Sequence, residues 1–354
     1  MGSVLVAMSG GVDSSVAACL LQEAGYDVRG SHLKLVHTGG VDHGCCGPAA
    51  ETDARAVAEV AGFPFEVVDL SETFEDRIVA DYLAEHRAGR TPNPCVRCNE
   101  RIKFGAFLDR ARDGGFDFVA TGHYVRTARD AGGRWRLYRG RDRAKDQSYV
   151  LAGLGQEQLS RSLFPIGDQT KDQTRGHARR LGLPVAGKPD SQDLCFAPAG
   201  DAGAFVEARA PDLVRQGEVV DPAGRVLGHH HGSHRFTIGQ RRGLGVSTGE
   251  RSYVVDVDAE ANRVMVGPDA LLARRGLAAE RVSWVAERPG GPFEAEVKVR
   301  YRGPEVAAAV DPVAEDGAMV EFRTPQRAVT PGQTVAFYAG DEVVGGGTIR
   351  EALR

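Results

Sequence analysis

The stretch SGGVDSS, residues 9–15, decides the fold of this chain. It follows a short apolar run at residues 4–8, which is typical of a buried strand in a parallel sheet. It leads into residues 16–21, whose apolar spacing predicts a helix that ends at Gly25. The sequence therefore predicts a strand, a glycine loop and a helix in direct succession.

This glycine loop has the chemistry of an anion-binding site. Gly10 and Gly11 let the backbone turn tightly and approach a ligand, and the first amides of a helix lack intrahelical partners. Asp13 would repel a bare phosphate, so its presence indicates that Mg²⁺ bridges the carboxylate and the phosphate. The lysine of the motif G-x-x-x-x-G-K-[ST] is missing, so this is not the usual nucleotide triphosphatase loop. An ordinary Ser/Gly turn before a capped helix is the alternative interpretation.

The composition indicates a globular chain with more than one domain. The 354 residues allow two or three domains, and 42% hydrophobic with 26% charged residues is an ordinary globular balance. We expect a cytoplasmic protein without membrane contact, because residues 1–8 lack a basic leader and no apolar run is long enough to span a bilayer. The net charge of −4 argues against a uniformly basic nucleic-acid binder.

Strand and helix patterns alternate up to residue 121, which predicts a doubly wound parallel sheet with ligands at the carboxyl ends of its strands. Further strands are predicted at 28–35, 65–70 and 116–121, and helices at 49–61, 73–86 and 102–113. A polar, glycine-rich stretch at 37–44 is predicted to be a mobile loop. From residue 217 onward, short β-type runs predict two small β units. The expected domains are 1–200, 201–275 and 276–354.

Two segments concentrate positive charge. Residues 124–139 predict a hairpin, and its second arm and the residues after it are basic: Arg134, Arg136, Arg139, Arg141, Arg143 and Lys145. The second cluster contains Lys171, Arg175, Arg179 and Arg180. A solvated charged face is one interpretation of the hairpin, and a surface that contacts nucleic-acid phosphates is the other.

The cysteines are interpreted as core, metal or catalytic thiols, because six of them are too few for a disulfide framework in a chain of this length. Cys95 and Cys98 form a C-x-x-C in a loop rich in proline and glycine, with basic neighbours that favour the thiolate. A structural zinc site would need two further ligands, and the adjacent Cys45 and Cys46 are poor partners in one tetrahedral site. Cys195 follows the polar residues 190–193, which fits an active-site loop as well as a buried core thiol.

The motifs together resemble those of the tRNA-specific 2-thiouridylases, which place sulfur on the wobble uridine of certain tRNAs. The matching stretches run nearly end to end: SGGVDSS, GRTPNPCVRCNERIKFG, FVATGHYVR, KDQSYVL, KPDSQDLCF, HRFTIGQRRGLGV, VKVRYR and PQRAVTPGQ. The resemblance implies that residues 1–200 are an adenine nucleotide α-hydrolase-like domain with the PP-loop of ATP pyrophosphatases. It also implies that the last domain is a β-barrel. Such an enzyme uses ATP and Mg²⁺ to adenylate the uridine 2-carbonyl, releases pyrophosphate and takes sulfur from a cysteine persulfide.

The resemblance also implies roles for individual residues. Cys195 carries the persulfide, and Cys98 attacks it and forms a transient Cys98–Cys195 disulfide, while Asp13 serves the ATP step. The ATP-binding residues carried over are Ala7, Met8, Ser9, Gly10, Gly11, Val12, Asp13, Ser14, Leu33 and Gly122. The tRNA-binding residues carried over are His123, Lys145, Asp146, Gln147, Arg300, Tyr301 and Gln333. The implied partners are a tRNA anticodon stem-loop and a persulfide donor or relay protein.

The chain departs from many members of that family at Cys95, where they carry an acidic residue. Cys95 is therefore an inert residue, an alternative nucleophile or a metal ligand, and with Cys98 and Cys195 it could hold an iron–sulfur cluster. Two rival functions also remain open. An amidating ATP pyrophosphatase would share the glycine loop without needing the thiols, and a nucleotide-gated RNA-binding protein would need no catalysis.

Overall fold

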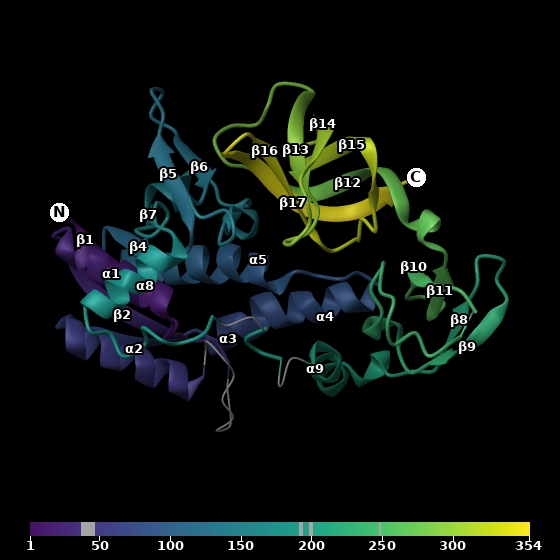
Figure 1. Cartoon of the computed structure of the whole chain (residues 1–354), viewed down its shortest axis with the longest axis horizontal. Helices are drawn as coiled ribbons and strands as arrows, with labels where there is room; N and C mark the ends of the chain where they lie inside the picture. The colour runs from purple at the N-terminus through teal and green to yellow at the C-terminus, as the bar shows by residue number, and fades with distance from the viewer. Residues whose placement is uncertain (37–46, 191–193, 198–200, 248) are drawn as a thin grey trace.

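A five-stranded parallel sheet forms the first part of the chain, at the left of Figure 1. The computed structural model describes residues 1–36, 47–190, 194–197, 201–247 and 249–354. The strand order is β3-β2-β1-β4-β7, with β1 (Ser3–Ala7), β2 (Asp27–Lys34), β3 (Phe65–Asp69), β4 (Phe118–Ala120) and β7 (Ser162–Leu163). All neighbouring pairs are parallel. The predicted α/β sheet is confirmed. Because its strands are parallel, their carboxyl ends lie at one edge of the sheet.

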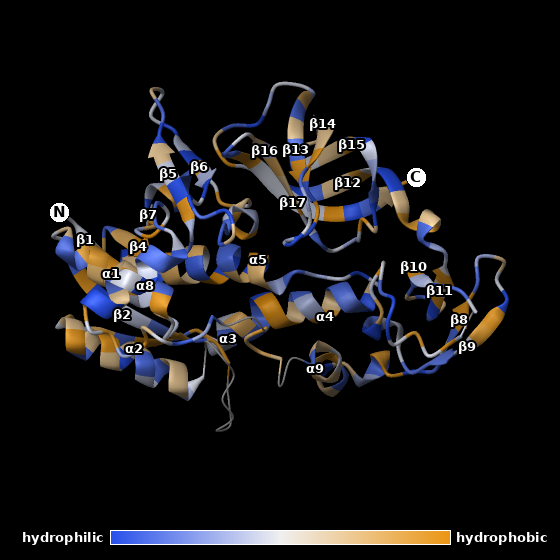
Figure 2. Ribbon diagram, viewed as in Figure 1, coloured by the Kyte–Doolittle hydropathy of each residue, from blue (hydrophilic) through white to orange (hydrophobic). Residues whose placement is uncertain are grey.

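Helices pack on both faces of this sheet. Val4 and Val6 of β1 lie in one apolar cluster with α1 (Val12–Glu23) and α2 (Pro48–Ala61), whereas Leu5 lies in a second cluster. In the part of the chain that the structure describes, six helices contribute side chains to the second cluster: α3 (Ser71–Phe74), α4 (Ala80–Arg87), α5 (Pro94–Cys98), α6 (Phe107–Asp113), α7 (Gln156–Ser160) and α9 (Ala202–Arg209). Helix α8 (Lys171–Arg180) packs beside α1. Figure 2 shows apolar and polar residues mixed along α2 and α4, as expected of helices with one buried face. Across the described ranges, no helix is long and apolar enough to cross a bilayer.

Two β structures follow the parallel sheet, as predicted. A four-stranded sheet has the order β10-β11-β8-β9 and consists of β8 (Gly217–Val220), β9 (Val226–His230), β10 (Tyr253–Asp258) and β11 (Arg263–Gly267). The last structure is a barrel, in which β12 (Ala273–Trp284), β15 (Gly317–Arg327), β14 (Val306–Val313), β13 (Phe293–Lys298), β16 (Thr334–Ala339) and β17 (Glu342–Leu353) are neighbours in that order. The pairing of β12 with β17 closes it. The predicted β-barrel is confirmed, and the domain limits at 200 and 275 stay predictions.

A hairpin from the first part of the chain extends the sheet of the barrel (Figure 1). It consists of β5 (Val125–Arg129) and β6 (Trp135–Arg139), and β6 pairs antiparallel with β17. Leu137 of β6 lies opposite Val343 of β17, and both side chains are fully buried. Both belong to the apolar cluster that also covers one face of the parallel sheet. The barrel and the first domain therefore share a core.

The basic arm of this hairpin is largely paired within the protein. Arg139 is only 4% exposed, forms an ion pair with Glu305, and its guanidinium carbon lies 3.7 Å from the ring centre of Tyr338. Arg136 forms an ion pair of 2.9 Å with Glu342 of β17. The expectation that this arm contacts nucleic-acid phosphates is therefore wrong for Arg139. Because Arg139 is buried beside Glu305, it belongs to the interface between the hairpin and the barrel.

Candidate functional site

The glycine loop lies at the carboxyl edge of the parallel sheet, between β1 and α1. Gly10 has a φ of +66°, and a Cβ at this position would collide with the backbone of Ala50. Gly122, which follows β4, approaches so closely that a Cβ there would lie 2.5 Å from the backbone nitrogen of Ser14. Helix α1 begins at Val12, so the amides at the end of the loop have no intrahelical acceptors. The backbone is therefore arranged to receive an anion.

The predicted ATP-binding residues come together from three neighbouring strands. Ala7 ends β1 and Met8 follows it, Leu33 lies near the end of β2, and Gly122 follows β4. The backbone nitrogen of Met8 donates to the carbonyl of Ser31 at 2.8 Å, which holds the ends of β1 and β2 together. In a parallel sheet this edge is where ligands bind. The geometry is consistent with the predicted ATP site.

Asp13 is engaged by two side chains from elsewhere in the chain. Both of its carboxylate oxygens lie 2.8 Å from Nζ of Lys171, at the start of α8, and the hydroxyl of Tyr124 donates to it at 2.9 Å. Burial and the nearby carboxylate of Asp13 raise the pKa of Tyr124, so its hydroxyl stays a donor. The sequence placed Lys171 in a basic cluster but did not identify its partner.

A second carboxylate, that of Asp190, lies in the same group of charges. Nζ of Lys171 approaches it at 2.7 Å, Nζ of Lys145 at 2.8 Å and the guanidinium of Arg175 at 3.4 Å. Burial opposes ionisation of Asp190, but hydrogen bonds from Lys145 and Lys171 outweigh it and lower its pKa to about 2. Sequence reasoning noted Asp190 only as a polar residue before Cys195, because these partners are distant in sequence.

The segment that leads to Cys195 is fastened to the glycine loop. Nζ of Lys188 donates to the carbonyl of Gly10 at 3.0 Å and forms an ion pair of 2.5 Å with Asp53. Residues 191–193 lie outside the described ranges. The contacts of Lys188 place the start of this segment beside the predicted phosphate site.

Cys95 and Cys98 lie on a helix, which corrects the predicted loop. Helix α5 begins at Pro94 and continues without a break into the π-helical segment Asn99–Ala106. Proline is well tolerated at the first position of a helix, so Pro94 starts this helix instead of preventing it. Cys95 is exposed, whereas Cys98 is only 8% exposed and packs into the apolar cluster beneath the sheet.

Cys195 packs against the same apolar cluster as Cys98, although the two residues are far apart in sequence. The neighbouring Phe196 is buried, with ring centroids 5.8 Å from that of Phe74 and 5.3 Å from that of Tyr82. Cys195 itself is half-buried. The structure thus supports an active-site position as well as a packed one, and Cys45 and Cys46 lie outside the described residues.

The loop before Cys95 is held by both β domains. The backbone nitrogen of Thr91 donates to the carbonyl of Pro331 at 2.9 Å, and Nε2 of Gln333 donates to the carbonyl of Thr91 at 2.8 Å. The hydroxyls of Thr91 and Thr237 lie 3.3 Å apart, which links the loop to the central domain. Arg97, between the two cysteines, hydrogen-bonds Thr348 of β17. Barrel and central domain therefore position the helix that carries Cys98.

The first group of predicted tRNA-binding residues is partly occupied by internal contacts. His123 is buried, and its Nδ1 lies 2.7 Å from the hydroxyl of Thr121; burial and then the charge of Lys103 set its pKa well below the usual range. Asp146 accepts from the hydroxyl of Ser148 at 2.8 Å.

Gln147 accepts a hydrogen bond from the backbone nitrogen of Tyr124 at 3.0 Å. Lys145 is bound to Asp190 but keeps 38% of its side chain exposed. Of this first group, Lys145 is thus a good candidate for direct contact with a phosphate.

The second group, from the barrel, lies beside the first. Tyr301 is 42% exposed, and its ring centroid lies 6.0 Å from that of Tyr149. Burial raises the pKa of Tyr301, and the charges of Asp146, Lys145 and Cys95 act on its hydroxyl as well. Tyr301 therefore packs beside Tyr149 and keeps part of its ring exposed.

Arg300 and Gln333 are turned toward the protein. The guanidinium of Arg300 hydrogen-bonds the carbonyl of Ala328 and lies 3.3 Å from the hydroxyl of Thr330. Burial and then the charge of Arg327 lower the pKa of Arg300. Contact of these residues with tRNA stays a prediction.

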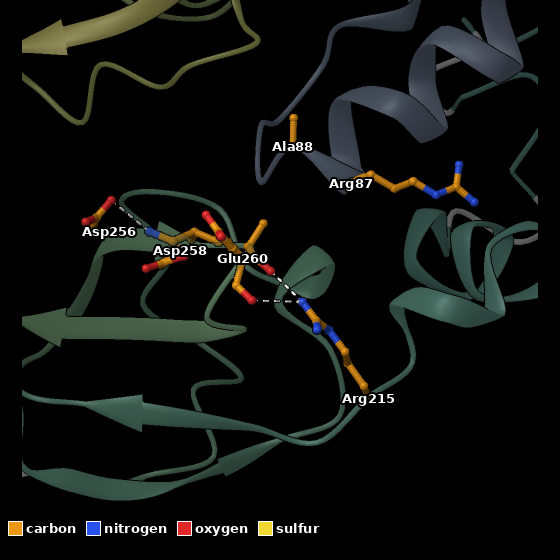
Figure 3. Close-up of a pocket in the computed structure, with 8 residues that line it drawn as sticks. Arg87, Ala88, Arg215, Asp256, Asp258 and Glu260 are labelled. Carbon is orange, nitrogen blue, oxygen red and sulfur yellow. Dashed lines mark hydrogen bonds between the residues drawn. The ribbon is translucent and has the colours of Figure 1, made fainter.

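Two hollows lie near the central domain. One, of about 440 Å³, is lined by the loop before Cys95, by Leu194 next to Cys195, and by residues of α4, α9 and the central domain. The other, of about 720 Å³, lies between the end of α4 and residues 256–260 (Figure 3). Arg215 in this second hollow donates to the carbonyl of Ala259 at 2.6 Å. Of these two hollows, only the first borders both the loop before Cys95 and the residue before Cys195.

Family models match almost the whole chain in three parts. Residues 2–199 match a model described as tRNA methyl transferase HUP domain. Residues 204–268 match the tRNA methyl transferase PRC-barrel domain, and residues 274–349 match the aminomethyltransferase beta-barrel domain. These descriptions agree with the α/β sheet, the small β domain and the closed barrel.

Curated relatives match the chain over nearly its full length. The tRNA-specific 2-thiouridylase MnmA of Geobacter metallireducens is 48% identical over 99% of this chain and 97% of its own length. The enzyme of the same name from Moorella thermoacetica is 47% identical over 99% of this chain and all of its own length.

Two solved structures resemble the chain remotely. The NMN synthetase of Francisella tularensis has a TM-score of 0.32 and 16% identity, covering 54% of this chain and 66% of its own. A 4-thiouridine synthetase in complex with RNA and ATP has a TM-score of 0.34 and 17% identity, covering 60% of this chain and 51% of its own. Likenesses this weak carry no functional argument.

Proposed function

Because the chain belongs to the tRNA-specific 2-thiouridylase family, we propose that it catalyses the ATP-dependent 2-thiolation of the wobble uridine of tRNA. One observation supports this function most: the segment that carries Cys195 is fastened to the glycine loop at Lys188 and packs against the same apolar cluster as Cys98. A nucleotide site and two thiols thus lie on connected structure. The family descriptions mention methyl transfer, but the curated relatives that span the chain are thiouridylases.

The first step of the proposed reaction activates the base. The 2-oxygen of uridine attacks the α-phosphorus of ATP, a new P–O bond forms, and the bond to pyrophosphate breaks. The unactivated 2-carbonyl is a poor electrophile, whereas the adenylate carries a good leaving group. The amides of the glycine loop and the first turn of α1 would hold the phosphates during this step.

The second step transfers sulfur. The Cys98 thiolate attacks the inner sulfur of the Cys195 persulfide, forming the Cys98–Cys195 disulfide and releasing hydrosulfide. Hydrosulfide adds to C2, AMP leaves with the former 2-oxygen, and loss of a proton leaves the C=S bond. A cellular thiol then reduces the disulfide, and a persulfide donor or relay protein reloads Cys195.

Mg²⁺ fits this site as an ion that arrives with ATP. Within the described ranges, no three His, Cys, Asp or Glu side chains are grouped to hold a metal. Asp13 could supply one carboxylate, and Mg²⁺ commonly binds phosphates with only one or two carboxylates. When bound, Mg²⁺ would neutralise phosphate charge. Cys95, Cys98 and Cys195 are not grouped closely enough in the described structure to share a metal, so as placed they do not fit an iron–sulfur cluster.

The tRNA would lie across the exposed Tyr301 and Lys145, with its anticodon loop directed toward the two thiols. A cytoplasmic location, where ATP and tRNA are present, completes the proposal.

The test is mass spectrometry of nucleosides from tRNA that was incubated with the protein, ATP, Mg²⁺ and a persulfide donor. 2-Thiouridine is the expected product, and incorporated nitrogen would instead identify an amidating enzyme. Binding of ATP and tRNA without pyrophosphate release would identify a nucleotide-gated binding protein.

The three cysteines separate the sulfur mechanisms. Cys195→Ser should carry no transferable sulfur, Cys98→Ser should load sulfur and stall, and Cys95→Ser should stay active. An inactive, iron-depleted Cys95→Ser variant beside an active, iron-containing wild type would overturn the persulfide route.

A further inference from the structure

We propose that Lys145, Lys171 and Arg175 form a binding site for the β- and γ-phosphates of ATP, and that Asp190 occupies this site until the phosphates displace it. The inference rests on the proposed use of ATP. It adds residues that lie outside the glycine loop and gives Asp190 a function of its own.

The three cations converge on one carboxylate from two different segments. Lys145 follows the hairpin, Lys171 and Arg175 lie one turn apart on α8, and Asp190 ends the segment after it. The ion-pair distances are 2.8, 2.7 and 3.4 Å respectively. A carboxylate surrounded by three donors occupies the place that an anion with more oxygens would fill.

The donors in this group suit an incoming phosphate. Lys145, Lys171 and Arg175 contribute three positive charges, opposite the carboxylates of Asp13, Asp190 and Asp142. Asp142 accepts from the backbone nitrogen of Lys171, the first residue of α8, at 2.9 Å. A di- or triphosphate carries more negative charge than Asp190 and offers more acceptors to the same donors.

The position of the group identifies the phosphates as those of a nucleotide. Nζ of Lys171 contacts Asp13 of the glycine loop as well as Asp190, so it bridges the loop and the proposed site. Lys171 is only 8% exposed, which places it too deep for the backbone of a folded RNA. Phosphates that extend from the loop amides reach Lys171 directly.

Asp190 is suited to be a temporary occupant, because its segment is held independently. Lys188 is bound to the carbonyl of Gly10, and Arg175 donates to the carbonyls of Ala186 and Lys188 at 3.0 and 3.1 Å. These bonds do not involve the carboxylate of Asp190. Asp190 can thus leave its cations while the segment before it stays attached, and Cys195 lies further along the same segment. Occupancy of the nucleotide site is thereby linked to the chain that carries Cys195.

The test measures binding of Mg²⁺-pyrophosphate and of AMP by calorimetry. Asp190→Asn should bind pyrophosphate about tenfold more tightly, as expected if the competing carboxylate leaves the site open about a tenth of the time. Its affinity for AMP should not change. Lys145→Gln, on a partly exposed side chain, should weaken pyrophosphate binding on the order of tenfold by removing a charge-assisted hydrogen bond.

The matched control is Glu23→Gln, which removes a carboxylate from Arg180 at the other end of α8 and should alter neither affinity. Unchanged or weaker pyrophosphate binding by Asp190→Asn would overturn the proposal, since Asp190 would then be a structural residue or a metal ligand. Tighter binding of tRNA but not of pyrophosphate would also overturn it and assign the cations to RNA. If the variants change pyrophosphate binding as expected but the wild type forms no thiouridine, the proposed function fails and the proposed phosphate site stands.

Discussion

Acid should destabilise the protein through His86, a buried histidine at the end of α4. Its ring centroid lies 4.6 Å from that of Tyr82, and among the residues that the structure describes its Nε2 has no hydrogen-bond partner. Burial and then the nearby His234 lower the pKa of His86 from 6.5 to about 4. The folded protein therefore keeps this ring neutral, whereas the unfolded chain takes up a proton below pH 6.5.

The magnitude follows from this difference in pKa. Between pH 6.5 and 4 the unfolded state binds more protons, so stability falls as the pH falls through this window. A difference of about 2.5 pKa units corresponds to about 3 kcal/mol, of which about 2 kcal/mol should be lost between pH 7 and 5.

Urea unfolding at pH 7 and pH 5 measures this loss. His86→Phe keeps an aromatic ring beside Tyr82 but cannot be protonated, so it should lose about 2 kcal/mol less than the wild type over this interval. His229→Asn, a change at an exposed histidine, should behave like the wild type. Equal losses in the wild type and His86→Phe would refute the reasoning, because the acid sensitivity would then come from other groups.

Two further predictions concern the proposed catalytic surface. Phe196→Ala removes a buried aromatic ring and should cost about 3 kcal/mol of stability. Because Phe196 anchors the neighbouring Cys195, the variant should also lose thiolation while pyrophosphate release persists. Equal loss of both activities would contradict this role of Phe196. In fluorescence anisotropy of labelled tRNA, replacing the exposed Arg141 by Gln should reduce the log–log salt slope by about 1. Arg139→Lys, at a buried position, should leave the slope unchanged, and a reduced slope there would mean that Arg139 reaches RNA.

The sequence was sufficient for the parts of the fold that depend on local pattern. The apolar run before the glycine loop and the alternation of Leu5 with its neighbours predict a buried parallel strand, and β1 confirms it. Pro94 was misleading, because a proline after another loop residue suggests a turn, although the same ring also suits the first position of a helix. Local pattern does not distinguish these two uses of proline.

Long-range partners were beyond the reach of the sequence. The arginines of β6 form a basic stripe along the chain, but Arg136 and Arg139 are neutralised by Glu342 and Glu305, which lie 206 and 166 residues away. A charge pattern shows the cations and not what they face. Lys171 was missed as a partner of Asp13 for the same reason, since 158 residues separate them.

The pairing of β6 with β17 has a consequence for anyone who wishes to express the chain without its barrel. A chain ended before Ala273 would lack β17, leaving the backbone of β6 as an unprotected edge and exposing Leu137, which is fully buried in the whole chain. Uncovered strand edges with apolar side chains promote association between copies. The truncated enzyme should therefore aggregate, and engineering that shortens this protein should retain the barrel.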